Sequence, residues 1–206
     1  MSQIPVVPGC SWYPQCLDQA AQRDLLECLR DILKVSPLFT PTMPRTGKPF
    51  SVRMTNCGSL GWVSDIKGYR YQSHHPETGE PWQPIPSAVL AIWERLSGYP
   101  HPPEACLMNW YAPGTRMGLH QDRDEHDFDA PVVSISLGDT GVFRIGGVTR
   151  GGKTVSVKLA SGDALVFGGP ARLAFHGIDR VIPGTSDLLK DGGRINLTLR
   201  RVTKPA

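Results

Sequence analysis

The amino-acid sequence predicts a mainly β protein of the α+β class, with N-terminal helices packed against a C-terminal β-sandwich or barrel. The first observation is composition: the 206 residues include 22 Gly and 19 Pro, whereas average usage would give about 25 of the two together. Because both residues weaken helix interiors, this excess disfavours a helical bundle. The second observation is that short apolar runs separated by turn residues recur after about Ala105, as in sandwiches and barrels.

Two helices are expected in the N-terminal half, and strands follow. Apolar residues with helical spacing run from Asp18 to about Val35, and a second such segment runs from about Pro86 to Leu96. The stretch between them is rich in Gly, Pro and aromatic residues. Strands are predicted at Cys106–Tyr111, Val132–Leu137, Gly141–Ile145, Val155–Leu159, Ala164–Phe167, Leu173–His176 and Arg194–Arg200. Since no repeat or linker divides the chain, we expect one domain over residues 1–206.

The charge is distributed unevenly. The formal net charge is +3, but the acidic turn, Asp122–Asp129, holds five acids and one arginine and carries −4. The rest of the chain therefore carries +7. A modestly basic surface is compatible with a polyanionic partner, although ordinary solubility explains it equally well.

Cysteine usage and the absence of an apolar leader indicate a cytoplasmic protein. There are five cysteines, an odd number, and no C-x-x-C pair, so neither a disulfide framework nor a zinc ribbon is expected. No apolar stretch approaches the roughly 20 residues that span a bilayer. We therefore predict no membrane partner.

The first chemical signal is His120-Gln121-Asp122. In an extended segment, residues i and i+2 point to the same side, so an imidazole and a carboxylate converge. His176, at the end of an apolar run, is a candidate third ligand. Two histidines and one carboxylate are the facial triad of non-haem Fe(II) oxygenases. Other histidines leave a different ligand set open, and a surface His120 or a core His176 is the simpler alternative.

The second signal is the strictly alternating segment Arg194–Arg200. Alternation places its polar residues on one face, which is either a solvated outer face or the wall of a polar pocket. Because arginine binds carboxylates in bidentate fashion, two arginines would suit a dicarboxylic acid. Asn109 and Tyr111 share a strand face just before the H-x-D segment and add an amide and a phenol. Together these signals suggest Fe(II) with 2-oxoglutarate as co-substrate.

Seven segments between about Met54 and Arg200 carry a more specific pattern. They are Met54-Thr55-Asn56-Cys57-Gly58 with Leu60-Gly61-Trp62; Gly68-Tyr69 with Tyr71; Asn109-x-Tyr111-Ala112-Pro113-Gly114; His120-Gln121-Asp122 with Asp124-Glu125; Ser134-Ile135-Ser136-Leu137-Gly138; His176-Gly177-Ile178; and Arg194-x-Asn196-Leu197-Thr198-x-Arg200. In this order they resemble the AlkB family of Fe(II)- and 2-oxoglutarate-dependent dioxygenases, and most closely its bacterial type. The first 50 residues contribute little to the resemblance.

The resemblance implies both a fold and an activity. The fold is a double-stranded β-helix, or jelly roll, over about residues 105–206, with N-terminal helices and a nucleotide-recognition lid in about 1–104. The activity is oxidative demethylation of bases such as 1-methyladenine and 3-methylcytosine in DNA or RNA, with single-stranded or damaged DNA as the expected partner. O₂ and 2-oxoglutarate are consumed, and formaldehyde, succinate and CO₂ are released. Separately, we expect a monomer.

The resemblance also implies roles for individual residues. By match, the iron ligands are His120, Asp122 and His176; the residues that hold 2-oxoglutarate are Asn109, Tyr111, Arg194, Asn196, Thr198 and Arg200; and the base and nucleic-acid site is formed by Trp62, Tyr69, Tyr71, Asp124 and Arg150. The sequence departs from the familiar bacterial pattern at Trp110, at Arg144-Ile145 and at Phe167, where Arg, a Phe-Gln-Phe-like segment and Trp are expected.

Two other functions stay open at this point. One is an oxygenase of the same chemistry that acts on a protein or lipid. The other is a non-catalytic β-sandwich binding module with a zinc or empty site. The bland alternatives for the lid residues are a core position for Trp62 and a solvated turn for Asp124.

Overall fold

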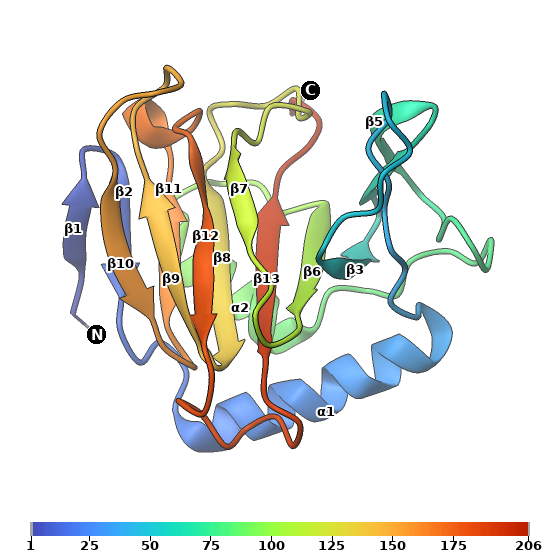
Figure 1. Ribbon diagram of the computed structural model, residues 1–206, viewed down its shortest axis with the longest axis horizontal. Helices are drawn as coiled ribbons and strands as arrows, with labels where there is room; N and C mark the ends of the chain where they lie inside the picture. Colours follow the sequence, from blue (N-terminus) through green and yellow to red (C-terminus); the bar gives the residue numbers. More distant parts are fainter. Residues whose placement is uncertain (1, 206) are drawn as a thin grey trace.

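The computed structural model describes residues 2–205 and contains two facing antiparallel sheets (Figure 1). The larger sheet has the strand order β1 (Ile4–Val7), β2 (Cys10–Tyr13), β11 (Ala164–Phe167), β8 (Val132–Gly138), β13 (Arg194–Arg200), β6 (Ala105–Tyr111) and β3 (Arg53–Gly58). The smaller sheet has the order β10 (Val155–Leu159), β9 (Thr140–Ile145), β12 (His176–Ile182) and β7 (Met117–His120). Two packed antiparallel sheets of this kind form the jelly-roll core that the family resemblance implies.

The two predicted helices are confirmed. Helix α1 (Gln19–Val35) begins after Asp18, whose side chain accepts a hydrogen bond from the Ala21 amide at 2.9 Å and so satisfies a free N–H of the first turn. Helix α2 is Ser87–Leu96, and a single 3₁₀ turn, η1, is Gly169–Ala171. Within residues 2–205, no helix is long and apolar enough to cross a bilayer.

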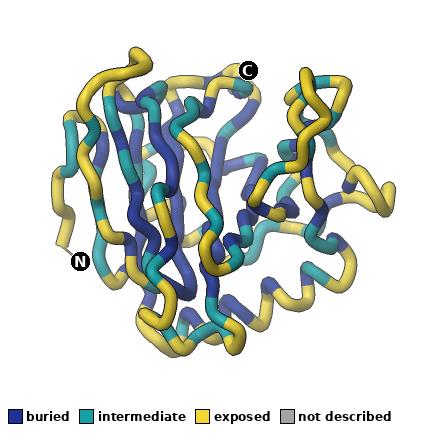
Figure 2. The backbone as a smooth tube through the Cα atoms, in the orientation of Figure 1, coloured by how far each residue is buried: buried dark blue, intermediate teal, exposed yellow. Residues whose placement is uncertain are grey.

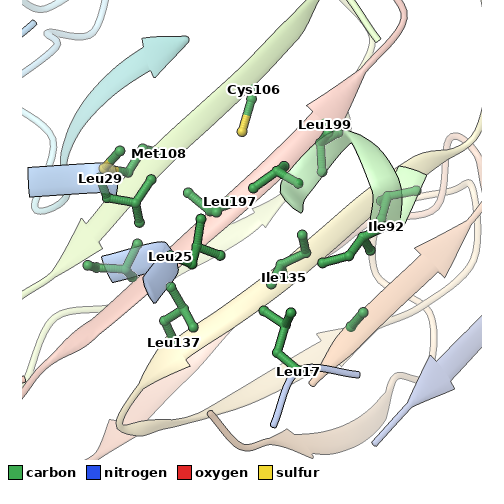
Figure 3. Packing of buried hydrophobic residues seen from close by; sticks show 14 of the residues in the cluster. Leu17, Leu25, Leu29, Ile92, Cys106, Met108, Ile135, Leu137, Leu197 and Leu199 are labelled. Atoms are coloured by element: carbon green, nitrogen blue, oxygen red, sulfur yellow. The ribbon is translucent and has the colours of Figure 1, made fainter. Parts of the chain in front are cut away.

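Both helices cover the face of the larger sheet that points away from the smaller sheet. Leu25 and Leu29 of α1 and Ile92 of α2 belong to one buried cluster with Ile135 of β8 and Leu197 of β13 (Figure 3). Each of these side chains is at most 2% exposed. This packing fixes the orientation of β13, because its apolar face must point to the helices.

The opposite face of β13 is polar and points between the sheets. All seven residues of the strand are buried, so its arginines are not on a solvated surface. Arg194 pairs in register with Tyr111 of β6, and Asn196 with Asn109. The alternative of a solvated outer face is therefore excluded, and the polar side chains of β6 and β13 lie side by side in the interior.

The strand predictions hold with one shift and several omissions. The predicted strand Leu173–His176 is wrong: β12 begins at His176 and continues to Ile182, because the preceding residues form a turn in which the Ala174 amide bonds to the Ala171 carbonyl. The strands β1 to β5 and the short β7 were not predicted as strands. Those near the N-terminus are short, and β2 is held by pairing with the distant β11.

A separate two-stranded lid ribbon projects beside the sandwich, and consists of β4 (Gly61–Asp65) and β5 (Gly68–Gln72). At its base the Asn56 side chain bonds to both the amide and the carbonyl of Trp62, each at 3.0 Å. At its tip Ile66 is 84% exposed. Figure 2 shows exposed and half-buried segments in this region, in contrast to the buried strands of the sandwich.

Candidate active site

A cavity of about 890 Å³ lies between the two sheets and opens toward the lid ribbon. This size is in the range of small-molecule sites. Of the residues that the sequence assigned to the site, all except Tyr71 line this cavity: Trp62, Tyr69, Asn109, Tyr111, His120, Asp122, Asp124, Arg150, His176, Arg194, Asn196, Thr198 and Arg200. The fold therefore brings together segments that are far apart in the sequence.

Three potential metal ligands converge at one end of the cavity. His120 ends β7, His176 begins β12, and the two residues are direct partners in the antiparallel ladder. Asp122 follows β7 by two residues. Candidate ligand atoms of the three side chains all lie within 4.8 Å of one another. Within residues 2–205, these three side chains form the one cluster of His, Cys, Asp or Glu residues that could hold a metal ion.

The two histidines are oriented as metal ligands need to be. The Nδ1 atom of His120 lies 3.0 Å from the Gly118 carbonyl, and that of His176 lies 3.0 Å from the Ala174 carbonyl. A carbonyl accepts, so each Nδ1 carries the proton and each Nε2 offers its lone pair. Burial lowers the pKa of His176 to about 4, which keeps the imidazole neutral near pH 7.

The third ligand, Asp122, is held ionised by an arginine. The Nε and Nη2 atoms of Arg200 donate to its Oδ2 at 3.0 and 2.8 Å. Burial alone would raise the pKa of Asp122, but Arg200 and the two histidines outweigh that effect and lower the pKa below its usual range. Neutral imidazoles and an ionised carboxylate form the donor set that a divalent iron ion requires.

At the other end of the cavity, a buried arginine lacks a negative partner. Arg194 is 1% exposed, and its Nη2 donates to Ser136 Oγ at 2.9 Å. Its Nε and Nη1 have no hydrogen-bond partner, and in the described chain no carboxylate pairs with it. Burial lowers the pKa of Arg194. A buried guanidinium with free donors fits a carboxylate ligand, as 2-oxoglutarate would provide.

Neighbouring side chains complete this end. Asn196 Nδ2 donates to Ser134 Oγ at 2.7 Å, and Thr198 Oγ1 donates to Asn196 Oδ1 at 2.9 Å. The buried Asn109 Oδ1 has no partner. Ser136 and Ser134 of β8 fix Arg194 and Asn196. Both belong to the segment Ser134–Gly138 of the family resemblance, but the sequence predicted no role for them. The available signal was their spacing: two serines at alternate positions of a predicted strand share one face.

The lid residues lie at the mouth of the cavity. The rings of Trp62 and Tyr69 are stacked, with centroids 5.6 Å apart and planes 18° apart. The indole of Trp62 donates to Asp124 Oδ2 at 2.8 Å. The guanidinium of Arg150 lies 4.8 Å from the centre of the Phe175 ring. Trp62 is thus half-buried at the mouth, whereas Tyr71 does not line the cavity and its hydroxyl donates to Glu125, which does.

The comparisons with known proteins decide the family. The model of the 2OG-Fe(II) oxygenase superfamily matches residues 9–200. The chain belongs to this superfamily. It is 56% identical to the AlkB homolog of Caulobacter vibrioides over 198 residues, which cover 96% of this chain and 90% of that protein. It is 40% identical to AlkB of Escherichia coli over 206 residues, with 98% and 94% of the two chains covered.

A solved structure agrees with this assignment. The structure of OsALKBH1 matches 97% of this chain and 100% of its own with a TM-score of 0.80, at 32% identity. The chain is therefore an AlkB-type dioxygenase, and its reaction uses Fe(II), 2-oxoglutarate and O₂. Membership in this enzyme family replaces the alternative of a non-catalytic binding module.

The departures from the bacterial AlkB pattern lie in different places. Trp110 packs against the helix-side core and faces away from the cavity. Arg144 lies on the outer face of the smaller sheet and donates to Thr154 Oγ1 at 2.8 Å. Phe167 lines the cavity, with its ring centre 4.8 Å from that of His176. Phe167 is therefore the departure that changes the surroundings of the metal site.

Proposed function

We propose that the protein demethylates N-alkylated bases of the 1-methyladenine and 3-methylcytosine type in DNA, with RNA as a second substrate. Formaldehyde, succinate and CO₂ are the expected products. Relatives named as a DNA N(6)-methyladenine demethylase in Arabidopsis thaliana and a tRNA demethylase in Schizosaccharomyces pombe support a nucleic-acid substrate. The observation that carries the proposal is one cavity that joins a His-Asp-His cluster, an unpaired buried arginine and an aromatic lid.

In this proposal His120, Asp122 and His176 hold the iron. The bound metal supplies the oxidation of the N-methyl group with O₂ and 2-oxoglutarate. The protein contributes a fixed ligand geometry: the β7–β12 ladder sets the two histidines, and Arg200 aligns the Asp122 carboxylate. Because both histidines are oriented by main-chain carbonyls, little reorganisation is needed when the metal enters.

The co-substrate is held along β6 and β13. Arg194 receives a carboxylate of 2-oxoglutarate on its free Nε and Nη1 atoms. The side chains that line the same wall are Asn109, Tyr111, Asn196 and Thr198. Arg200 acts at the opposite end, where its ion pair with Asp122 puts a positive charge beside the metal ligands. The two arginines that the sequence singled out thus serve the two ends of one elongated site.

The damaged base enters under the lid ribbon. A base must leave its stack to reach a buried metal, and methylation of its pairing edge lowers that cost. Trp62 and Tyr69 offer aromatic faces at the mouth, and Asp124 offers a carboxylate for an exocyclic amine. Arg150 and Tyr71 complete the nucleic-acid site: Arg150 meets phosphate at the mouth, and Tyr71 holds the ribbon through Glu125.

The broader setting of the protein is also a proposal. We propose a single-domain monomer that acts in the cytoplasm on single-stranded or damaged nucleic acid. The five cysteines are all free, which fits a reducing compartment. The +7 charge outside the acidic turn fits a polyanion. These features favour nucleic acid over a protein or lipid substrate.

The test is formaldehyde release from methylated oligonucleotides with Fe(II), 2-oxoglutarate and O₂. Single-stranded and duplex DNA and RNA, each with one methylated base, are compared with methylated peptides. Formaldehyde from the oligonucleotides and none from the peptides supports the proposal. Turnover of peptides alone would contradict the substrate class, and full activity of His120→Ala would contradict the iron assignment.

A further inference from the structure

A buried charge network lies behind the proposed iron ligands. Arg172, which follows η1, is 3% exposed and does not line the cavity. Its Nε donates to the Ala130 carbonyl at 2.9 Å, its Nη1 to the Asp122 carbonyl at 2.8 Å, and its Nη2 to Glu125 Oε2 at 3.1 Å. One guanidinium therefore fixes three points of the segment that carries the ligand Asp122.

Glu125 connects this network to the lid. Its side chain is 4% exposed, and its second oxygen, Oε1, accepts a hydrogen bond from the Tyr71 hydroxyl of β5. The same oxygen lies 3.5 Å from Nε of Arg200, the arginine that aligns Asp122. A continuous chain of contacts thus runs from the lid ribbon through Glu125 to both the main chain and the carboxylate of the ligand.

The charges of the network cancel. Two guanidiniums, of Arg172 and Arg200, face two carboxylates, of Asp122 and Glu125, and all four are buried. Apolar residues would fill such a space at a lower cost in desolvation, so a network of this kind is best explained by the geometry that it fixes. The geometry fixed here is that of a proposed iron ligand relative to the lid.

We propose that Arg172 is a positioning residue that, through Glu125 and Tyr71, couples iron binding to closure of the lid ribbon. The inference rests on the proposed role of Asp122 as an iron ligand. Arg172 holds the Asp122 main chain, so metal binding, which orders Asp122, also orders Glu125. Glu125 in turn holds Tyr71 and the ribbon. By linkage, a closed lid must strengthen metal binding by the same factor by which metal favours closure.

The experiment uses Co(II) as a probe of the metal site in the metal-free full chain. The variants are Arg172→Lys, which keeps the charge but loses the planar fork, and Tyr71→Phe, which loses the hydroxyl that reaches Glu125. Arg180→Lys is the matched control, because Arg180 forms an exposed ion pair with Asp179 on β12. Titration gives the Co(II) dissociation constant, and hydrogen exchange reports the protection of residues 61–72.

In the native protein, Co(II) is expected to increase the protection of residues 61–72. Arg172→Lys should weaken Co(II) binding about 10- to 100-fold, the usual effect of disturbing groups that hold metal ligands, and should abolish the Co(II)-dependent protection. Tyr71→Phe should clearly reduce that protection, with a smaller, few-fold loss of affinity, because the Trp62 bond to Asp124 still joins the ribbon to the acidic turn. Arg180→Lys should match the native protein in both measurements.

Two results would overturn the proposal: Co(II) affinity of Arg172→Lys within about twofold of native, or Co(II)-dependent lid protection at the native level in Tyr71→Phe. Thermal melting checks that each variant is folded; if Arg172→Lys does not fold, Tyr71→Phe still decides. His120→Ala separates the two levels of inference. Native Co(II) affinity in that variant would refute the iron assignment itself, whereas lost affinity there with unaltered Arg172→Lys would refute only the coupling.

Discussion

The metal end of the cavity and the lid ribbon are built on opposite principles. His176 and Arg200 are each 6% exposed and lie on strands inside the two sheets. The Ala174 carbonyl orients His176, and Arg200 forms an ion pair with Asp122. In the ribbon, Tyr69 is 50% exposed and Ile66 84% exposed. The ribbon pairs as a sheet with itself and reaches the acidic turn through the side chains of Trp62 and Tyr71.

This difference separates chemistry from recognition. A metal site works when its ligands are held in place before the metal arrives, here by main-chain carbonyls and an ion pair. A site that admits bases attached to a long polymer needs a surface that can adjust, and segments with few buried contacts open at low cost. Substitutions at the metal end should therefore affect metal binding and stability, whereas substitutions in the lid ribbon should affect substrate recognition.

The largest expected effect comes from Asp122→Ala at the metal end. It removes a proposed ligand and leaves the buried Arg200 with only its longer, 3.5 Å contact to Glu125, so metal binding and demethylation should be lost. Unfolding free energy should fall by about 3–5 kcal/mol, the typical cost of breaking a buried ion pair. Co(II) titration, formaldehyde assays and urea unfolding measure the three quantities. A variant that kept native stability would contradict the tight pairing inferred for this end.

Next in size is Arg194→Met, at the co-substrate end of the cavity. Charge-assisted hydrogen bonds are worth about 1.5–3 kcal/mol, so the KM for 2-oxoglutarate should rise about 10- to 100-fold. Co(II) affinity should stay unchanged, because Arg194 does not contact the triad. Steady-state kinetics at varied 2-oxoglutarate make the measurement. An unaltered KM would contradict the proposal that Arg194 binds a carboxylate of 2-oxoglutarate. It would also contradict the proposal that Arg194 and Arg200 serve the two ends of one site.

A smaller effect is expected in the lid, from Trp62→Ala. Stacking of a base on an aromatic side chain is worth about 1–3 kcal/mol, so kcat/KM for a methylated oligonucleotide should fall about 5- to 100-fold. Succinate formation without nucleic acid should be unaffected. Trp62→Phe, which keeps a stacking face but loses the bond to Asp124, is the matched control. Equal losses in both variants would assign the effect to the Asp124 contact rather than to stacking.

The smallest effect is expected for Ile66→Ala at the tip of the ribbon. An exposed side chain outside the packed regions changes stability by no more than about 0.5 kcal/mol. Urea unfolding should therefore give the native midpoint, and activity on a single-stranded oligonucleotide should be native. A large loss of stability would show that the ribbon is packed far more firmly than its exposure indicates.

The same division explains what could be predicted from the sequence. Alternation in Arg194–Arg200 predicted two faces correctly, because side chains alternate in any strand. It could not decide whether the polar face meets water or a cavity, since that depends on α1 and α2 covering the other side. The three proposed metal ligands were found because their residue types and spacing carry chemistry of their own.

Features that depend on distant partners were not predicted. Strands β1 and β2 are four residues each; β2 pairs with β11, far along the chain, and β1 in turn pairs with β2. Glu125 was read as one more charge of an acidic turn, and Arg172 gave no local signal. Their significance comes from mutual burial, which a single sequence does not display. Arg200 was assigned to 2-oxoglutarate alone, whereas its ion pair with Asp122 appears only in three dimensions.

The position of β13 has a consequence for how the protein folds. It follows every other strand in chain order but lies in the middle of the larger sheet, between β8 and β6. The β1-β2-β11-β8 half and the β6-β3 half can therefore join only after β13 has been synthesised. Contacts between residues so distant in the chain also slow folding. Because β13 carries Arg194 and Arg200, a nascent chain that lacks it has neither a complete sheet nor a complete cavity. The protein therefore cannot bind its co-substrate and oxidise a substrate before the sheet that encloses the site has formed.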